Sequence, residues 1–196
     1  MANGNNKRFL SDPLRFLTEN EYCDIDFSGR HSPGSGVYDM DFVVNDFLYM
    51  KDYNNREHHY GAVPVHAYYL SAYANSVSTM NMGGAADYFF TPMISGCTFA
   101  VYGHDRKNIL ASHINDYDRK GLCTQTINGI LGVNYNFCRI LSKADDAAGI
   151  ADPNVQTYNW DLQHRDPILV FGMRDVNGDW HFYKKLIGEG NPFTEM

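Results

Sequence analysis

The sequence predicts an α+β protein whose core is a sandwich-like pair of mixed β-sheets flanked by a few helices, formed as a single domain over residues 1–196. A chain of 196 residues is long enough to bury one full hydrophobic core without disulfides or metal. Its 14 Tyr and 12 Phe favour strands, and its 17 Gly favour turns. Short β-branched and aromatic runs alternate with turn residues, whereas segments of helical periodicity are few.

The N-terminal part of the chain is predicted to contain a short helix followed by strands. Ser11-Asp12-Pro13 precedes three apolar residues in the next four positions, which indicates a capped helix with proline in its first turn. Residues 22–27 alternate as a strand does, and residues 37–49 carry enough Val, Phe and Tyr for one or two strands. Residues 62–77 fit either a helix or a pair of strands, and the pattern does not choose between them.

The C-terminal part is predicted to be mostly β-structure as well. Residues 123–141 contain short β-like runs interrupted by glycines, and residues 143–163 are predicted to form loop or short helix. Ile168–Gly172 and Trp180–Leu186 flank the turn residues Asp175–Asp179, which indicates a β-hairpin. Together with the N-terminal strands, this hairpin accounts for a core made of two sheets.

The central segment is predicted to form a second hairpin. Cys97–Tyr102 and Ile109–Ile114 are strand-like, and the residues between them are typical of a turn. With the turn centred on Asp105, antiparallel pairing sets Cys97 opposite His113. Side chains alternate along a strand, so these two residues share a face that is otherwise apolar. A register shift of one residue would put them on opposite faces.

This hairpin carries the residues of a candidate thiol site. Cys97 follows Ser95-Gly96, Thr91 lies six positions upstream of it, and His113 lies sixteen positions downstream. In such a site the cysteine can act as the nucleophile and the histidine as the base, and the hydroxyl can orient the histidine. The arrangement indicates thiol chemistry on an acyl group.

These motifs resemble those of a known family. Phe89-Phe90-Thr91, Ile94-Ser95-Gly96-Cys97 and His113-Ile114 resemble the single-domain glutamine-deamidating toxins typified by Burkholderia lethal factor 1, in which the cysteine motif is Leu-Ser-Gly-Cys. That family is related in fold to the catalytic domain of the cytotoxic necrotizing factors and to the chemotaxis deamidase CheD. The gap between cysteine and histidine is longer here than in the closest toxin, and a longer hairpin turn accounts for it. The match covers about thirty of the 196 residues.

The resemblance implies a bacterial toxin or effector, a single deamidase-like domain that converts a glutamine side chain of a host protein to glutamate through a thioester. In this scheme Cys97 is the nucleophile, held as a thiolate by His113, and Thr91 orients His113 by a hydrogen bond. Donors for the oxyanion are expected at the Cys97 backbone N–H and its neighbours Gly96 and Ser95. The host substrate implied is a translation-initiation helicase or a Rho-family GTPase, and the chain is expected to act as a monomer without a cofactor.

Composition limits the other partners. The net charge of −7 argues against nucleic-acid binding, which requires basic patches. No apolar run approaches the roughly 18 residues of a transmembrane helix, so no membrane partner is expected. The polar N-terminus lacks the features of a Sec signal peptide, so a toxin would be secreted or translocated by another route to act in the host cytosol. Four cysteines without C-x-x-C spacing indicate reduced thiols and predict no metal site.

Other functions remain open from the residues alone. A thiol protease or a transglutaminase would use the same acyl-enzyme and would differ in leaving group and acceptor. A binding module could keep the fold without turnover, and iodoacetamide would then label Cys97 no faster than Cys23, Cys123 or Cys138. His104 is a rival base, but its place in the hairpin turn predicts a solvated side chain.

Overall fold

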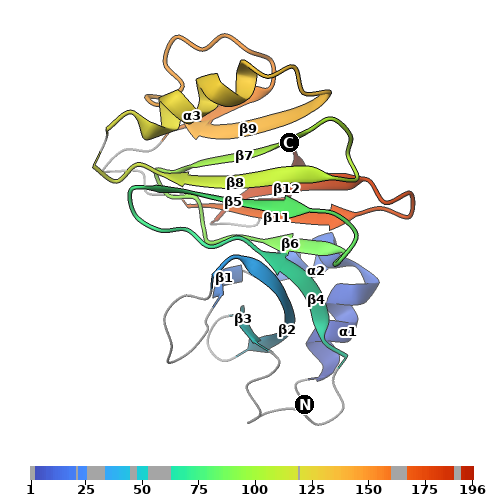
Figure 1. Cartoon of the computed structure of the whole chain (residues 1–196). Coiled ribbons are helices and arrows are strands. Elements are labelled where there is room, and N and C mark those ends of the chain that lie inside the picture. Colours follow the sequence, from blue (N-terminus) through green and yellow to red (C-terminus); the bar gives the residue numbers. More distant parts are fainter. Residues whose placement is uncertain are drawn as a thin grey trace.

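Two β-sheets pack face to face in the computed structural model, with α3 on the outer side of one sheet and α1 and α2 against the other (Figure 1). The structure describes residues 3–20, 22–25, 34–44, 48–52, 63–118, 120–159, 167–187 and 191–196. Both sheets are mixed, since each contains parallel and antiparallel pairs. The predicted α+β class with a two-sheet core is therefore confirmed.

The larger sheet has eight strands in the order β1-β3-β2-β4-β6-β11-β12-β13. Its β1–β3 and β4–β6 pairs are parallel, and its other pairs are antiparallel. The strands are β1 (Tyr22–Ile25), β2 (Gly36–Val44), β3 (Leu48–Asp52), β4 (Val65–Tyr69), β6 (Tyr88–Phe90), β11 (Ile168–Arg174), β12 (Trp180–Leu186) and β13 (Thr194–Glu195).

The smaller sheet has five strands in the order β10-β9-β7-β8-β5. Only the pair at one edge, β10 with β9, is parallel. The strands are β5 (Ser76–Met82), β7 (Thr98–Gly103), β8 (Ile109–Asn115), β9 (Phe137–Lys143) and β10 (Val155–Tyr158). Of the predicted site residues, His113 lies on β8 and Cys97 directly precedes β7.

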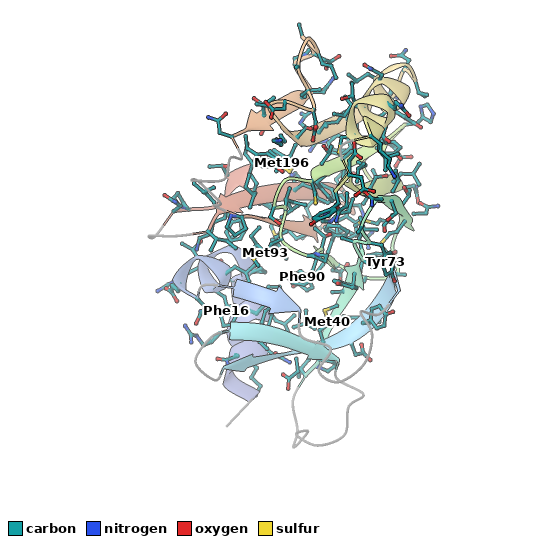
Figure 2. All side chains as sticks on the ribbon, turned by 90° about the vertical axis from the view of Figure 1, so that its left-hand side faces the viewer. Phe16, Met40, Tyr73, Phe90, Met93 and Met196 are labelled. Atoms are coloured by element: carbon teal, nitrogen blue, oxygen red, sulfur yellow. The ribbon has the colours of Figure 1, made fainter. Side chains whose placement is uncertain are left out.

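Three apolar clusters follow from the alternation of side chains along the strands. The first lies between the sheets and includes Phe99 and Val101 of β7. The second lies between the larger sheet and helices α1 (Asn3–Ser11) and α2 (Pro13–Glu19), and the third lies beneath α3 (Leu122–Leu131). Figure 2 shows three members of the second cluster, Phe16, Met40 and Phe90, in the same part of the molecule.

Several local predictions are confirmed. Asp12 caps α2 by accepting a hydrogen bond from the Arg15 N–H at 3.1 Å, with Pro13 at the first helical position. The β11–β12 hairpin turns at Asp175, whose side chain accepts from the N–H groups of Asn177 and Asp179. The undecided region 62–77 contributes β4 and the start of β5, so the strand alternative is the correct one.

The prediction of β-like runs over residues 123–141 is wrong for its first half. Cys123, Ile127 and Ile130 are buried at helical spacing, and they pack α3 against the smaller sheet. Gly129 lies on the exposed side of the helix, and Gly132 follows its last turn. Gly129 is therefore tolerated at an exposed position of the helix, and Gly132 lies at the helix end, so neither glycine interrupts a strand.

Candidate active site

The register of the β7–β8 hairpin differs from the prediction by two residues. Phe99, not Cys97, pairs with His113, so the predicted opposition of Cys97 and His113 is wrong. These pairs centre the turn on residue 106 instead of on Asp105, whose carboxylate accepts from two following backbone N–H groups, both at 2.7 Å.

A shift of two residues keeps every side chain on its predicted face, because the alternation along a strand has a period of two. Cys97, Phe99 and Ala111 all belong to the apolar cluster between the sheets. Cys97 lies two residues before the partner of His113, which makes it the diagonal neighbour of His113 across the hairpin. Diagonal neighbours have Cα atoms ~7–8 Å apart and their β-carbons somewhat closer, within reach of a histidine side chain.

Thr91 lies just after β6 and its hydroxyl holds the ring of His113. Thr91 Oγ1 is 2.8 Å from His113 Nδ1 and 3.0 Å from the Leu70 carbonyl oxygen. A hydroxyl has one hydrogen, and here it is donated to Leu70, so the Thr91 oxygen accepts from the Nδ1–H of His113. This network assigns the proton to Nδ1 and leaves the Nε2 lone pair available.

The Nε2 atom of His113 is buried and has no hydrogen-bond partner among the described residues. The side chain is 1% exposed, and an unsatisfied buried polar atom costs about 1–3 kcal/mol. Burial lowers the pKa of His113 to about 4, so the ring is neutral at physiological pH. His113 thus presents an unprotonated ring nitrogen on the face that also carries Cys97.

The buried neutral histidine predicts a loss of stability in mild acid. The His113 pKa is 6.5 when exposed and about 4 in the folded chain, so the unfolded chain binds the proton more tightly. The contribution of His113 to the free energy of unfolding is therefore fully present above pH 6.5. It falls by roughly 3 kcal/mol in total as the pH drops towards 4. Denaturant unfolding at several pH values measures this decline. His113→Gln is expected to flatten this part of the curve, and an unchanged curve would contradict the assignment.

Cys97 does not rest as a thiolate, in contrast to the prediction. It is 6% exposed, and burial raises the pKa of its thiol to about 11. Its Sγ lies 3.9 Å from the Ser95 carbonyl oxygen, to which the S–H donates. The unbound site therefore holds a neutral thiol beside a neutral imidazole. Attack by Cys97 requires its proton to pass to a base as the reaction proceeds, as in serine–histidine pairs.

The loop before Cys97 is held in place at two points. Ile94 exchanges two backbone hydrogen bonds with Ile168 of β11, at 2.8 and 2.9 Å. The Tyr158 hydroxyl, on β10, donates to the Cys97 carbonyl oxygen at 2.5 Å. Between these points Ser95 is exposed and Gly96 has a φ of 78°. Tyr158 could not be identified from the sequence, because nothing in its local pattern indicates a contact with a residue so distant along the chain.

Gly96 is predicted to be essential to this loop conformation. A side chain at this left-handed φ costs ~1–2 kcal/mol, so Gly96→Ala is expected to destabilise the fold by that amount and to displace Cys97. Gly129→Ala is the matched control, because a Cβ there meets open space in a helix and is expected to stabilise by ~0.5–1 kcal/mol. Denaturant unfolding measures both, and a Gly96→Ala chain as stable as the wild type would contradict the prediction.

The other candidate groups lie apart from this site. His104 is in the loop between β7 and β8, away from the strand end that carries Cys97, with its ring centroid 5.2 Å from that of Tyr135. Within the described ranges no group of three or more His, Cys, Asp or Glu residues could hold a metal ion. No helix in that part of the chain is both long and apolar enough to cross a membrane. The side chain of Cys23 lies outside the described residues.

Comparison with known proteins identifies the fold. No family model matches the chain, and no curated protein matches it. Among solved structures, the C-terminal domain of CNFy from Yersinia pseudotuberculosis matches with a TM-score of 0.50 over 87% of this chain and 75% of that chain, at 9% sequence identity. At this identity the likeness shows the fold alone and does not single out the lethal factor 1 group. The chain therefore has a fold like that of the C-terminal domain of the toxin CNFy.

Proposed function

We propose that this chain is a bacterial toxin or effector that hydrolyses the side-chain amide of a glutamine in a host protein to glutamate. One observation carries the proposal. The Thr91 hydroxyl fixes His113 so that a partnerless Nε2 lone pair lies on the sheet face that carries Cys97. A thiol beside an oriented, unprotonated imidazole is the arrangement that acyl transfer through a thioester requires. The toxin fold of the structural neighbour is consistent with it.

The chemistry follows from the two neutral groups. As Cys97 Sγ attacks the carboxamide carbon, its proton passes to His113 Nε2. The imidazolium then gives this proton to the amide nitrogen, which leaves as ammonia, and a thioester with Cys97 remains. Water attacks the thioester with His113 as base, which releases glutamate and restores the thiol. Thr91 keeps the ring oriented throughout by accepting the Nδ1–H hydrogen bond.

The oxyanion is assigned to the loop that leads into β7. Backbone N–H groups are effective donors to a developing oxyanion when they are fixed before the reaction. The Cys97 backbone is fixed by the Tyr158 hydroxyl on its carbonyl and by the left-handed Gly96 before it. We assign the Cys97 N–H as one donor, with the second from the exposed Ser95 or from Gly96.

The proposal extends to the setting of the reaction. A single deamidase-like domain of this kind would be secreted or translocated and would act as a monomer in the host cytosol, on a translation-initiation helicase or a Rho-family GTPase. The test is to incubate these host proteins with the wild-type chain and with Cys97→Ser, and to measure intact and peptide masses. We expect one glutamine to become heavier by the difference between a hydroxyl and an amino group, with the wild type alone.

The same measurement separates the alternatives. Peptide fragments would indicate a protease. With a primary amine added to the incubation, a mass gain equal to that of the amine less one ammonia would indicate a transglutaminase. Unchanged masses in every protein tested would contradict the proposal. A binding module without catalytic turnover would then be the remaining alternative.

A further inference from the structure

A cavity of about 330 Å³ opens near the predicted site, at the end of the sandwich where β11 begins and β12 ends. The part of its lining that the structure describes is mostly apolar and includes one cation, Lys184. The lining residues are Ile168, Lys184, Leu186, Asn191, Pro192 and Thr194. Leu186, which is 43% exposed, lies at the end of β12 and lines the cavity where it opens to solvent.

Lys184 is the unusual member of this lining. It lies on the face of β12 that points between the sheets, with Trp180 and Phe182 on the same face. The side chain is partly buried, and among the described residues its ammonium has neither an ion pair nor a hydrogen-bond partner. Burial lowers the pKa of Lys184, because the charged ammonium is poorly solvated there. A desolvated cation without a partner is stabilised by any carboxylate that reaches it.

The cavity and Cys97 lie at the same end of the molecule. Ile168 pairs with Leu186 on one side and with Ile94, in the loop that leads to Cys97, on the other. Strands are spaced by ~4.8 Å, so Ile94 and Leu186 lie roughly 10 Å apart. An extended peptide covers this distance in about three residues.

We infer that this cavity is a subsite for an acidic side chain of the substrate protein, three to six residues from the glutamine that Cys97 attacks, since Cys97 lies three residues beyond Ile94. The apolar walls fit the methylene groups of a glutamate, and Lys184 binds its carboxylate. The occupant is identified by charge complementarity, since Lys184 is the single cation among the described lining residues. The role of the subsite in substrate recognition rests on the proposed function. The binding of an acidic side chain in the cavity does not.

Binding is tested without turnover, in a Cys97→Ser background. The probes are N-acetyl-glutamate amide and its neutral isostere N-acetyl-glutamine amide, and the signals are the NMR methyl resonances of Ile168 and Leu186. We expect saturable shifts with the acid and at least about tenfold weaker binding of the amide. Lys184→Met should remove the preference, Lys184→Arg should retain it, and Lys107→Met in the distant hairpin loop is the control. Equal binding of the two probes, or an unchanged preference in Lys184→Met, would overturn the inference.

The role in catalysis is tested with the Cys97 chain and two sets of peptides. One set carries a glutamate at each of the positions three to six residues from the glutamine, and the other carries alanine there. We expect a roughly tenfold higher kcat/KM for the acidic set than for the alanine set, and we expect this ratio to fall to about one in Lys184→Met. Deamidation of both sets at equal rates would overturn the assignment to the substrate. If no peptide is deamidated while the acid probe binds as expected, the subsite stands and the proposed function fails.

Discussion

Cys97→Ser is expected to reduce glutamine deamidation by about 10³-fold or more, because it removes the nucleophile of the proposed mechanism. A serine hydroxyl is far less acidic than a thiol, and its proton would have to pass to His113, whose pKa of about 4 makes it a weak base. The fold is expected to persist, since serine has nearly the volume of cysteine. The measurement is the rate at which the amide-to-acid mass change accumulates on a fixed amount of substrate.

Cys138→Ser provides the matched control. Cys138 is 7% exposed against 6% for Cys97, and burial raises the pKa of both thiols to about 11. It lies on β9, in the cluster beneath α3, on the opposite side of the smaller sheet from the predicted site. We expect this variant to retain activity. Equal losses in the two variants would show that thiol burial, and not nucleophilic attack, is what the substitutions disturb.

His113→Gln is expected to lower kcat by roughly 10²–10⁴-fold, the usual contribution of a general acid–base group. Glutamine retains a hydrogen-bonding side chain opposite Thr91 but cannot accept and return the Cys97 proton. In the wild type, activity is expected to rise with pH through about 4, as Nε2 loses its proton, and then to level off towards neutrality. This rise should be absent from the residual activity of the variant.

His104→Gln is the control for this second substitution, because His104 belongs to the same hairpin but lies in its loop. We expect its kcat and its pH profile to match the wild type. Full activity in a folded His113→Gln chain would refute the base assignment, and a loss confined to His104→Gln would move the base to the hairpin loop.

The parts of the structure that depend on local chemistry could be predicted from the sequence. Asp12 and Pro13 mark the start of α2 through a capping side chain and a missing N–H, both properties of single residues. The side chains on each face of β7 and β8 could be predicted because side chains alternate along a strand. A register error of two residues does not change the face on which a side chain lies. The order of Thr91, Cys97 and His113 along the chain therefore indicated three residues that the fold brings to one region.

The remaining features depend on contacts between residues distant along the chain or on burial, and neither can be predicted from the local sequence pattern. The hairpin turn is centred one residue later than predicted, beside Asp105, whose carboxylate accepts from two backbone N–H groups, and this moves the register by two residues. The resting protonation of Cys97 and His113 follows from their burial between two sheets, so a thiolate could not be excluded beforehand. The contact of Tyr158 with Cys97 depends on β10 pairing in parallel with β9, which no local pattern indicated.

The protonation of His113 is the most direct test of how the site works, and it needs no substrate. Long-range ¹H–¹⁵N correlation spectra of the histidine rings report which ring nitrogen carries the proton. At neutral pH we predict a neutral His113 ring with its proton on Nδ1 and a bare Nε2, which gains a proton only when the pH falls to about 4. A proton on Nε2, or a charged ring at neutral pH, would contradict the assignment of Nε2 as the acceptor of the Cys97 proton.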